Sequence, residues 1–196
     1  MKTNIFGLAL CLLAACKSSP DQPALQSGAK DTASTVRAGI TPLAKADTGV
    51  TYETYCNARY GYCLSYPAAL VVMQPEAESG DGRIFNNSAG EELGRVYRSM
   101  IADPDVPALS PKEAMKAALT AFKAGLAEEG QGAAEIPYAT SGKDFYVFSA
   151  KAGKWIYYRK AIFKADEYAL LIFKYPEEQK AQYDVVVSRM SQSFHW

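Results

Sequence analysis

Three consecutive segments near the C-terminus, 144–150, 155–163 and 168–175, are apolar on both faces when they are read as strands. Alternate residues of a strand point to opposite faces of its sheet. One face of the second segment carries Trp155, Tyr157, Ala161 and Phe163, and the opposite face carries Ile156, Tyr158 and Ile162. A strand that is apolar on both faces belongs to a sheet that is covered on both sides. The chain must therefore supply two covering layers.

Two helical patterns can supply these layers. Ser110 is a capping residue, Pro111 suits the first helical position, and Glu113 completes a capping box. This helix extends to about residue 129, and its apolar stripe is Met115, Leu119, Phe122 and Leu126. A second helix begins at Pro176, and its apolar stripe is Tyr183, Val186, Val187, Met190 and Phe194.

Shorter apolar runs come before the first helix. They predict strands over 52–56, 62–66, 70–74, 83–86 and 93–101. Ala152-Gly153 and Ala165-Asp166 lie where tight turns would join antiparallel strands. The order of elements therefore predicts an α+β fold, an α/β/α sandwich in which two helices cover a mainly antiparallel sheet.

Aromatic residues define the extent of this domain. Of the 23 aromatic residues (13 Tyr, 8 Phe and 2 Trp), only Phe6 lies in the first 50 positions. Residues 17–50 are rich in small and polar residues, and such a segment buries too little surface to offset its chain entropy. We expect a single domain over 51–196, preceded by a disordered tether.

The first residues have the pattern of an export signal. Lys2 precedes an uncharged apolar run that is shorter than the roughly 20 residues needed to span a bilayer. Leu13-Ala14-Ala15-Cys16, at its end, resembles the lipobox of bacterial lipoproteins. That resemblance implies cleavage after residue 15 and a diacylglycerol on the Cys16 thiol, so that 16–50 is a lipidated cysteine followed by a tether. The alternative is an ordinary secretory signal that contains a chance cysteine.

The resemblance to lipoproteins also implies where in the cell the protein lies. Lys17 follows the cysteine, where an Asp would retain a lipoprotein in the inner membrane of enteric bacteria. The lipobox followed by Lys17 therefore favours a lipid-anchored protein of the bacterial cell envelope, in the outer membrane. The formal net charge of zero argues against a broad basic face that binds nucleic acid.

A second resemblance concerns the domain. Residues 59–67 read Arg-Tyr-Gly-Tyr-Cys-Leu-Ser-Tyr-Pro and resemble the start of PsbP-like domains and of the related LpqN-type and DcrB-type lipoproteins. It implies the α/β/α fold and a non-enzymatic assembly or binding module. Residues 57–67 with Gly80-Asp81-Gly82-Arg83 also resemble uncharacterised exported bacterial proteins, which implies no activity.

Cys56 and Cys63 are the two cysteines of the domain. An even number of cysteines in an exported protein predicts a disulfide. The bridge would close a loop of eight residues and contribute about 2.5 kcal/mol in the loop-entropy model. Its spacing does not fit a redox Cys-x-x-Cys pair.

Other candidate sites have structural alternatives. His195 is the only histidine, so a hydrolase would depend on it, and a helix cap or a frayed end explains it as well. Glu76, Glu78 and Asp81 do not match an EF-hand loop and favour a solvated turn. We therefore predict no catalytic residue, metal or cofactor.

Aromatic side chains of the long strands are the remaining candidate site. They are Tyr146, Trp155, Tyr157, Tyr158 and Tyr168. These residues either line a groove for a ligand or fill the core.

Two functions follow from the sequence as a whole. The first is a membrane-anchored, non-catalytic binding or assembly domain whose partner is an envelope protein. The second is a carrier of a lipid or other small apolar ligand. The sequence does not specify the oligomeric state.

Overall fold

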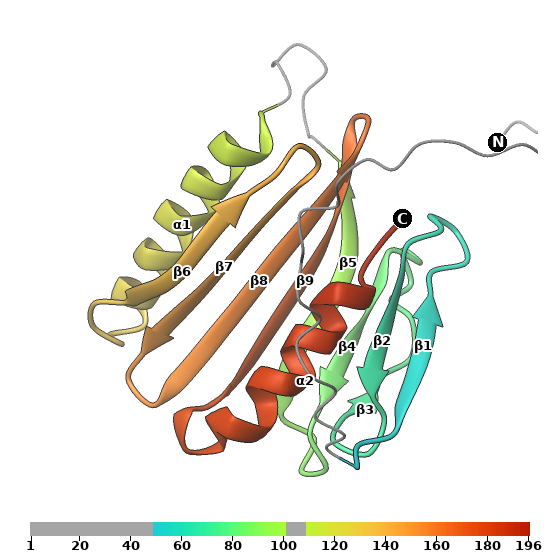
Figure 1. Ribbon diagram of the computed structural model, residues 1–196, viewed down its shortest axis with the longest axis horizontal. Helices are drawn as coiled ribbons and strands as arrows, with labels where there is room; N and C mark the ends of the chain where they lie inside the picture. The colour runs from blue at the N-terminus through green and yellow to red at the C-terminus, as the bar shows by residue number, and fades with distance from the viewer. Residues whose placement is uncertain (1–48, 101–108) are drawn as a thin grey trace, which may run out of the picture. The chain divides into compact units, whose positions relative to one another are not determined.

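The computed structural model describes residues 49–100 and 109–196, which lie in a unit spanning Ala44–Trp196. The predicted signal peptide, Cys16, Lys17 and nearly all of the tether lie outside the described residues. An antiparallel sheet of seven strands forms the centre of the described unit, in the order β3-β4-β5-β9-β8-β7-β6 (Figure 1). The strands are β3 (Val72–Met73), β4 (Gly82–Asn86), β5 (Glu92–Met100), β6 (Glu135–Ser141), β7 (Phe145–Ala152), β8 (Trp155–Lys164) and β9 (Glu167–Pro176).

One face of this sheet, here called the α2 face, is covered by the C-terminal helix and an N-terminal hairpin. Helix α2 (Lys180–Ser193) packs on β8 and β9, and a 3-10 turn (Glu177–Gln179) leads into it. Strands β1 (Tyr52–Cys56) and β2 (Cys63–Pro67) form a separate two-stranded sheet, and β2 packs on α2. Their shared core contains Tyr55, Tyr62, Leu64, Phe85, Phe173, Val186 and Met190.

The opposite face, here called the α1 face, is covered by α1 (Pro111–Glu128). The predicted capping box is present: the Ser110 hydroxyl accepts a hydrogen bond from the Glu113 amide, and the Glu113 carboxylate accepts one from the Ser110 amide. Ala118 and Leu126 are buried, and the Phe122 ring packs 5.9 Å from that of Phe148. The α+β fold and both covering layers are thereby confirmed.

The two helices are staggered across the sheet. Helix α1 packs on β6 and β7, at one side of the sheet, whereas α2 packs nearer its centre (Figure 1). Within the described residues, β4 and β5 therefore have no helix on the α1 face, and β6 and β7 extend past α2 on the α2 face. Each face keeps one half without a helix, and the candidate sites lie beside the covering helices.

Several predicted elements needed correction. Strand β6 (Glu135–Ser141) was not predicted, because it is a mostly exposed edge strand with Pro137 inside it and shows no apolar alternation. The segment 70–74 forms only the two-residue strand Val72–Met73, because residues 68–70 turn back on Pro67, whose carbonyl accepts hydrogen bonds from the amides of Leu70 and Val71.

Candidate ligand-binding site

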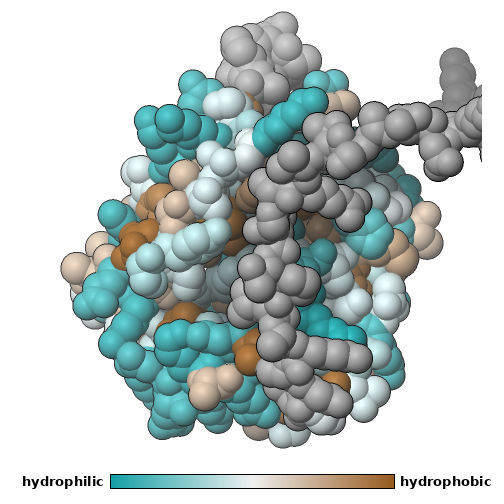
Figure 2. Space-filling view, viewed as in Figure 1, coloured by the Kyte–Doolittle hydropathy of each residue, from teal (hydrophilic) through white to brown (hydrophobic). Residues whose placement is uncertain are grey.

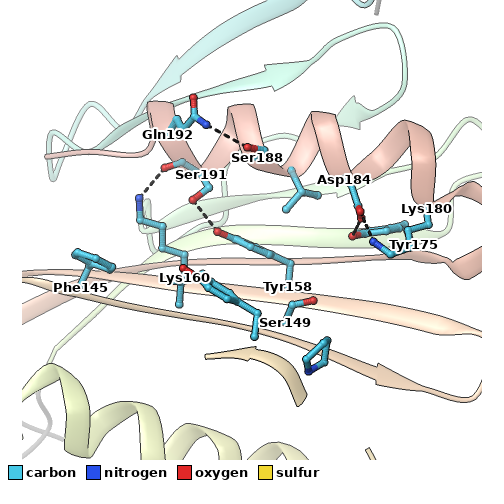
Figure 3. Close-up of a pocket in the computed structure, with 14 residues that line it drawn as sticks. Phe145, Ser149, Tyr158, Lys160, Tyr175, Lys180, Asp184, Ser188, Ser191 and Gln192 are labelled. Atoms are coloured by element: carbon cyan, nitrogen blue, oxygen red, sulfur yellow. Dashed lines mark hydrogen bonds and ion pairs between the residues drawn. The ribbon is translucent and has the colours of Figure 1, made fainter. Parts of the chain in front are cut away.

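The open half of the α2 face holds a cavity of about 560 Å³ between α2 and strands β6–β8 (Figure 3). Figure 2 shows this face, on which hydrophilic side chains predominate and hydrophobic ones are scattered. The cavity is here called the α2-side cavity. Tyr158 and Lys160 reach into it from β8, and Ser191 faces them from the last turn of α2 (Figure 3).

Hydrogen bonds tie these three residues together. The Tyr158 hydroxyl donates to Ser191 Oγ at 2.6 Å, and the Lys160 ammonium donates to the Ser191 carbonyl at 2.6 Å. Burial raises the pKa of Tyr158 to about 12 and lowers the pKa of Lys160. Lys160 also lies near the carbonyl end of α2, where the helix dipole favours a cation. These contacts join α2 to the sheet.

A second polar cluster lies at the other end of the same cavity. The Tyr175 hydroxyl donates to the Asp184 carboxylate at 2.7 Å, and Lys180 forms an ion pair with the same carboxylate. Burial and the bond to Asp184 raise the pKa of Tyr175. The polar groups of this cavity are thus largely paired with one another, and their contacts hold α2 in place.

The α1 face holds a second cavity, of about 370 Å³, between α1 and strands β7–β9, here called the α1-side cavity. Four alanines of α1, a run of small side chains at helical spacing, form one wall: Ala114, Ala117, Ala118 and Ala121. Phe163 and Tyr168 add aromatic surface from the sheet. Met100 and Leu109 also line it and are 59% and 48% exposed.

Arg159 is the charged residue of the α1-side cavity lining. Its Nε donates a hydrogen bond to the Tyr146 hydroxyl at 3.1 Å. Burial raises the pKa of Tyr146, and the guanidinium opposes that shift by favouring the ionised phenol. The cavity is therefore apolar over most of its lining and cationic at one point.

The five aromatic residues predicted to line one groove do not lie together. Tyr146 and Tyr168 line the α1-side cavity, whereas Tyr158 lines the α2-side cavity. Tyr157 packs against Phe122 of α1 at 5.1 Å between ring centroids. The single-groove prediction is wrong because 157 and 158 are neighbours on one strand and must point to opposite faces.

Trp155 has a different environment from the other four. Its ring is flanked by the ammonium groups of Lys154 and Lys174, 5.7 and 5.5 Å from the ring centroid. It lies at the first residue of β8, away from both cavities described above.

Arg159 and Lys160 were not singled out from the sequence. The available signal was their position: two consecutive cations interrupt the apolar pattern of β8 between Tyr158 and Ala161. Because consecutive strand residues face opposite ways, each cavity receives one of these two cations. Two charged residues inside an otherwise apolar strand thus indicated the positions of both cavities.

The predicted disulfide is confirmed. Cys56 and Cys63 are bonded, with 4.1 Å between their Cα atoms, and they face each other across the β1–β2 ladder. The acidic turn nearby is structural: Glu76 accepts hydrogen bonds from Tyr55 and Asn57, both at 2.7 Å. Across 49–100 and 109–196, no group of three or more His, Cys, Asp or Glu residues is placed to hold a metal ion.

His195 is held in the fold. Its backbone pairs with that of Cys63 through hydrogen bonds of 2.8 and 3.0 Å, so the predicted fraying does not occur. Its Nδ1 lies 2.7 Å from the Ser193 carbonyl, and a carbonyl accepts only, so Nδ1 is the donor. The ring therefore caps the end of α2, as the alternative interpretation predicted.

Comparison with known proteins concerns the fold. The solution structure of cyanobacterial PsbP (CyanoP) from Synechocystis sp. PCC 6803 matches with a TM-score of 0.53 and 16% identity, over 83% of this chain and 97% of that one. The fold is PsbP-like. No family model and no curated protein sequence matches the chain. None of the helices in the described part of the chain has the length and apolar character required to span a membrane.

Proposed function

We propose that this chain is a lipid-anchored protein of the bacterial cell envelope that displays a non-catalytic binding domain. The observation that carries the proposal is the staggered cover of the PsbP-like domain, which leaves cavities of about 560 and 370 Å³ on opposite faces. Volumes of this size are typical of small-molecule sites. The position of His195 supports a non-catalytic role, because its ring nitrogen bonds a backbone carbonyl and not a serine or carboxylate side chain.

The anchor is supported by the lipobox at Leu13-Ala14-Ala15-Cys16. Two or more acyl chains at Cys16 would hold the protein stably at a membrane, whereas one would not. The test is metabolic labelling with an alkyne-tagged fatty acid in bacteria that express the full chain. We expect the wild type to be labelled and to sediment with membranes, and Cys16→Ser to lose both properties. Labelling that persists in Cys16→Ser would contradict the anchor.

Outer-membrane placement is supported by Lys17. Separation of inner and outer membranes on a density gradient tests it. The wild type is expected in the outer-membrane fraction, and Lys17→Asp is expected to move to the inner membrane of an enteric host. An identical distribution of the two chains would contradict this part of the proposal.

A carrier of an apolar ligand is the second candidate function, and the apolar lining of the α1-side cavity favours it. Photoreactive apolar probes that label peptides of α1 and β8 would support the carrier. A crosslinking pull-down from intact envelopes tests the alternative, in which the domain binds an envelope protein. Capture of the same protein by the wild type and by a variant with a filled α1-side cavity would favour the assembly role.

A further inference from the structure

The α1-side cavity combines an apolar interior with one fixed cation. The alanine wall of α1 and the rings of Phe163 and Tyr168 offer surface to a hydrocarbon or aromatic body. The guanidinium of Arg159 lies in the same lining. An arginine presents its N–H groups as a planar fork that matches a carboxylate.

Arg159 is not neutralised by the described residues. Their four ion pairs involve Arg95, Arg98, Lys151 and Lys180, and none involves Arg159. Its hydrogen bond to Tyr146 uses Nε, so both Nη groups have no bonding partner within 49–100 and 109–196. A partly buried cation with two open donor groups favours an anionic partner.

Arg95 provides a comparison on the same face. Arg159 and Arg95 flank Ile172, one on β8 and the other on β5. The Arg95 guanidinium is held by the Glu92 carboxylate through two hydrogen bonds of 2.7 and 2.8 Å. The chain thus neutralises one of these two arginines with its own acid and leaves Arg159 with the neutral hydroxyl of Tyr146.

We propose that the α1-side cavity binds a monoanionic amphiphile, a carboxylate on a hydrocarbon body, with the carboxylate on Arg159 and the body along the alanine wall of α1. The inference rests on the proposed carrier function and deepens it by adding the headgroup. A single cation beside a hydroxyl balances one negative charge. The small side chains of α1 leave the space that the hydrocarbon body occupies.

The test is photocrosslinking of the full chain in isolated envelopes. The probe is a medium-chain fatty acid with a diazirine and an alkyne, added without ATP or coenzyme A so that enzymes attach no acyl group to Cys16. Labelled peptides are identified by mass spectrometry. We expect saturable labelling of α1 and β8 in the wild type. Arg159→Gln is expected to raise the half-saturating concentration at least about tenfold, and Arg159→Lys to raise it less.

Two controls separate the headgroup from the cavity. The alcohol with the same chain is expected to label the wild type more weakly than the acid does, a comparison that needs no variant. Ala121→Leu, which fills the cavity from an exposed helix position, is expected to lose labelling, whereas Ala124→Leu on the same helix is expected to keep it. Thermal unfolding of each variant verifies folding.

The outcomes are distinguishable. Equal half-saturation for acid and alcohol, or an unchanged value in Arg159→Gln, would overturn the anionic headgroup and leave the apolar carrier standing. Absence of saturable labelling of α1 and β8 by either probe would overturn both. Acid labelling that depends on Arg159 and is lost in Ala121→Leu would support the full proposal.

Discussion

At the scale of single residues, polar groups inside the domain decide how its parts are joined. Asn57 is 1% exposed, and its side chain connects three segments. The Asn57 amide donates to Glu76 Oε1 at 2.7 Å and to the Gly80 carbonyl at 3.0 Å. Its carbonyl oxygen accepts from the amides of Arg59 and Tyr60, which shapes the turn between β1 and β2.

Replacing Asn57 tests this role. Asn57→Ala leaves the Gly80 carbonyl and turn amides without their partner, and we expect it to lower the free energy of unfolding by about 2–3 kcal/mol. Asn57→Asp, almost identical in size, is expected to be at least as harmful because its carboxylate would face Glu76. Urea unfolding followed by circular dichroism measures both. A neutral effect of Asn57→Asp would contradict the hydrogen-bond assignment.

The disulfide in the same hairpin gives a second prediction. We expect Cys56→Ser/Cys63→Ser to lower the free energy of unfolding by about 2.5 kcal/mol, because the bridge restricts an eight-residue loop in the unfolded chain. The measurement is the urea midpoint of the oxidised wild type against the double variant. The reduced wild type is the control and is expected to match the double variant. Identical midpoints for oxidised and reduced protein would show that the bridge adds nothing.

At the scale of elements, the sequence predicted what local interactions specify. The capping box placed the start of α1 correctly at Ser110 and Pro111, and the buried stripe of α2 occurs as expected. Strand β6 was not predicted because its residues show no apolar alternation. Pairing with β7 at the edge of the sheet specifies this strand. The alternation of β8 places Tyr157 and Tyr158 on opposite faces, and this local pattern already excludes one groove lined by both residues.

The cap of α1 yields a pH-dependent prediction. Hydrogen bonds from the Ser110 side chain and backbone hold the pKa of the Glu113 carboxyl below its ordinary value of 4.5. A carboxyl whose pKa is lowered by folding stabilises the fold above its ordinary pKa, and that contribution is lost as the pH falls through the lowered pKa. We expect Ser110→Ala to lower the free energy of unfolding by about 1 kcal/mol at neutral pH.

Measurement of thermal unfolding between pH 7 and pH 3 tests this sign. The difference between wild type and Ser110→Ala is expected to shrink as the pH falls. Thr120→Ala is the matched control on the same helix, since the Thr120 hydroxyl donates to the Lys116 carbonyl of that helix and takes no part in the cap. A difference that grows on acidification would contradict the role of Glu113.

At the scale of the whole molecule, the division of the chain into tether and domain remains a prediction. Trypsin has sites at Lys17, Lys30, Arg37 and Lys45 in the proposed tether. We expect brief digestion to cut there first and to leave a fragment beginning at Ala46 that unfolds at the same temperature as the intact chain. Cleavage within the strands β1–β9 at an equal rate would contradict the boundary.

Sequence alone determined the class of the domain, its two covering helices and the pairing of its cysteines, because hydrophobic periodicity, capping and cysteine number act locally. The stagger of the helices, and therefore the two cavities, was decided by the tertiary structure. Strand order puts β6 and β7 outside the part of the sheet that α2 covers, and it puts β4 and β5 outside the part that α1 covers. Arg159 and Lys160 point to opposite faces because they are neighbours on one strand, but the packing of α1 and α2 on those faces decides that each of them lines a cavity, and no local pattern encodes that packing.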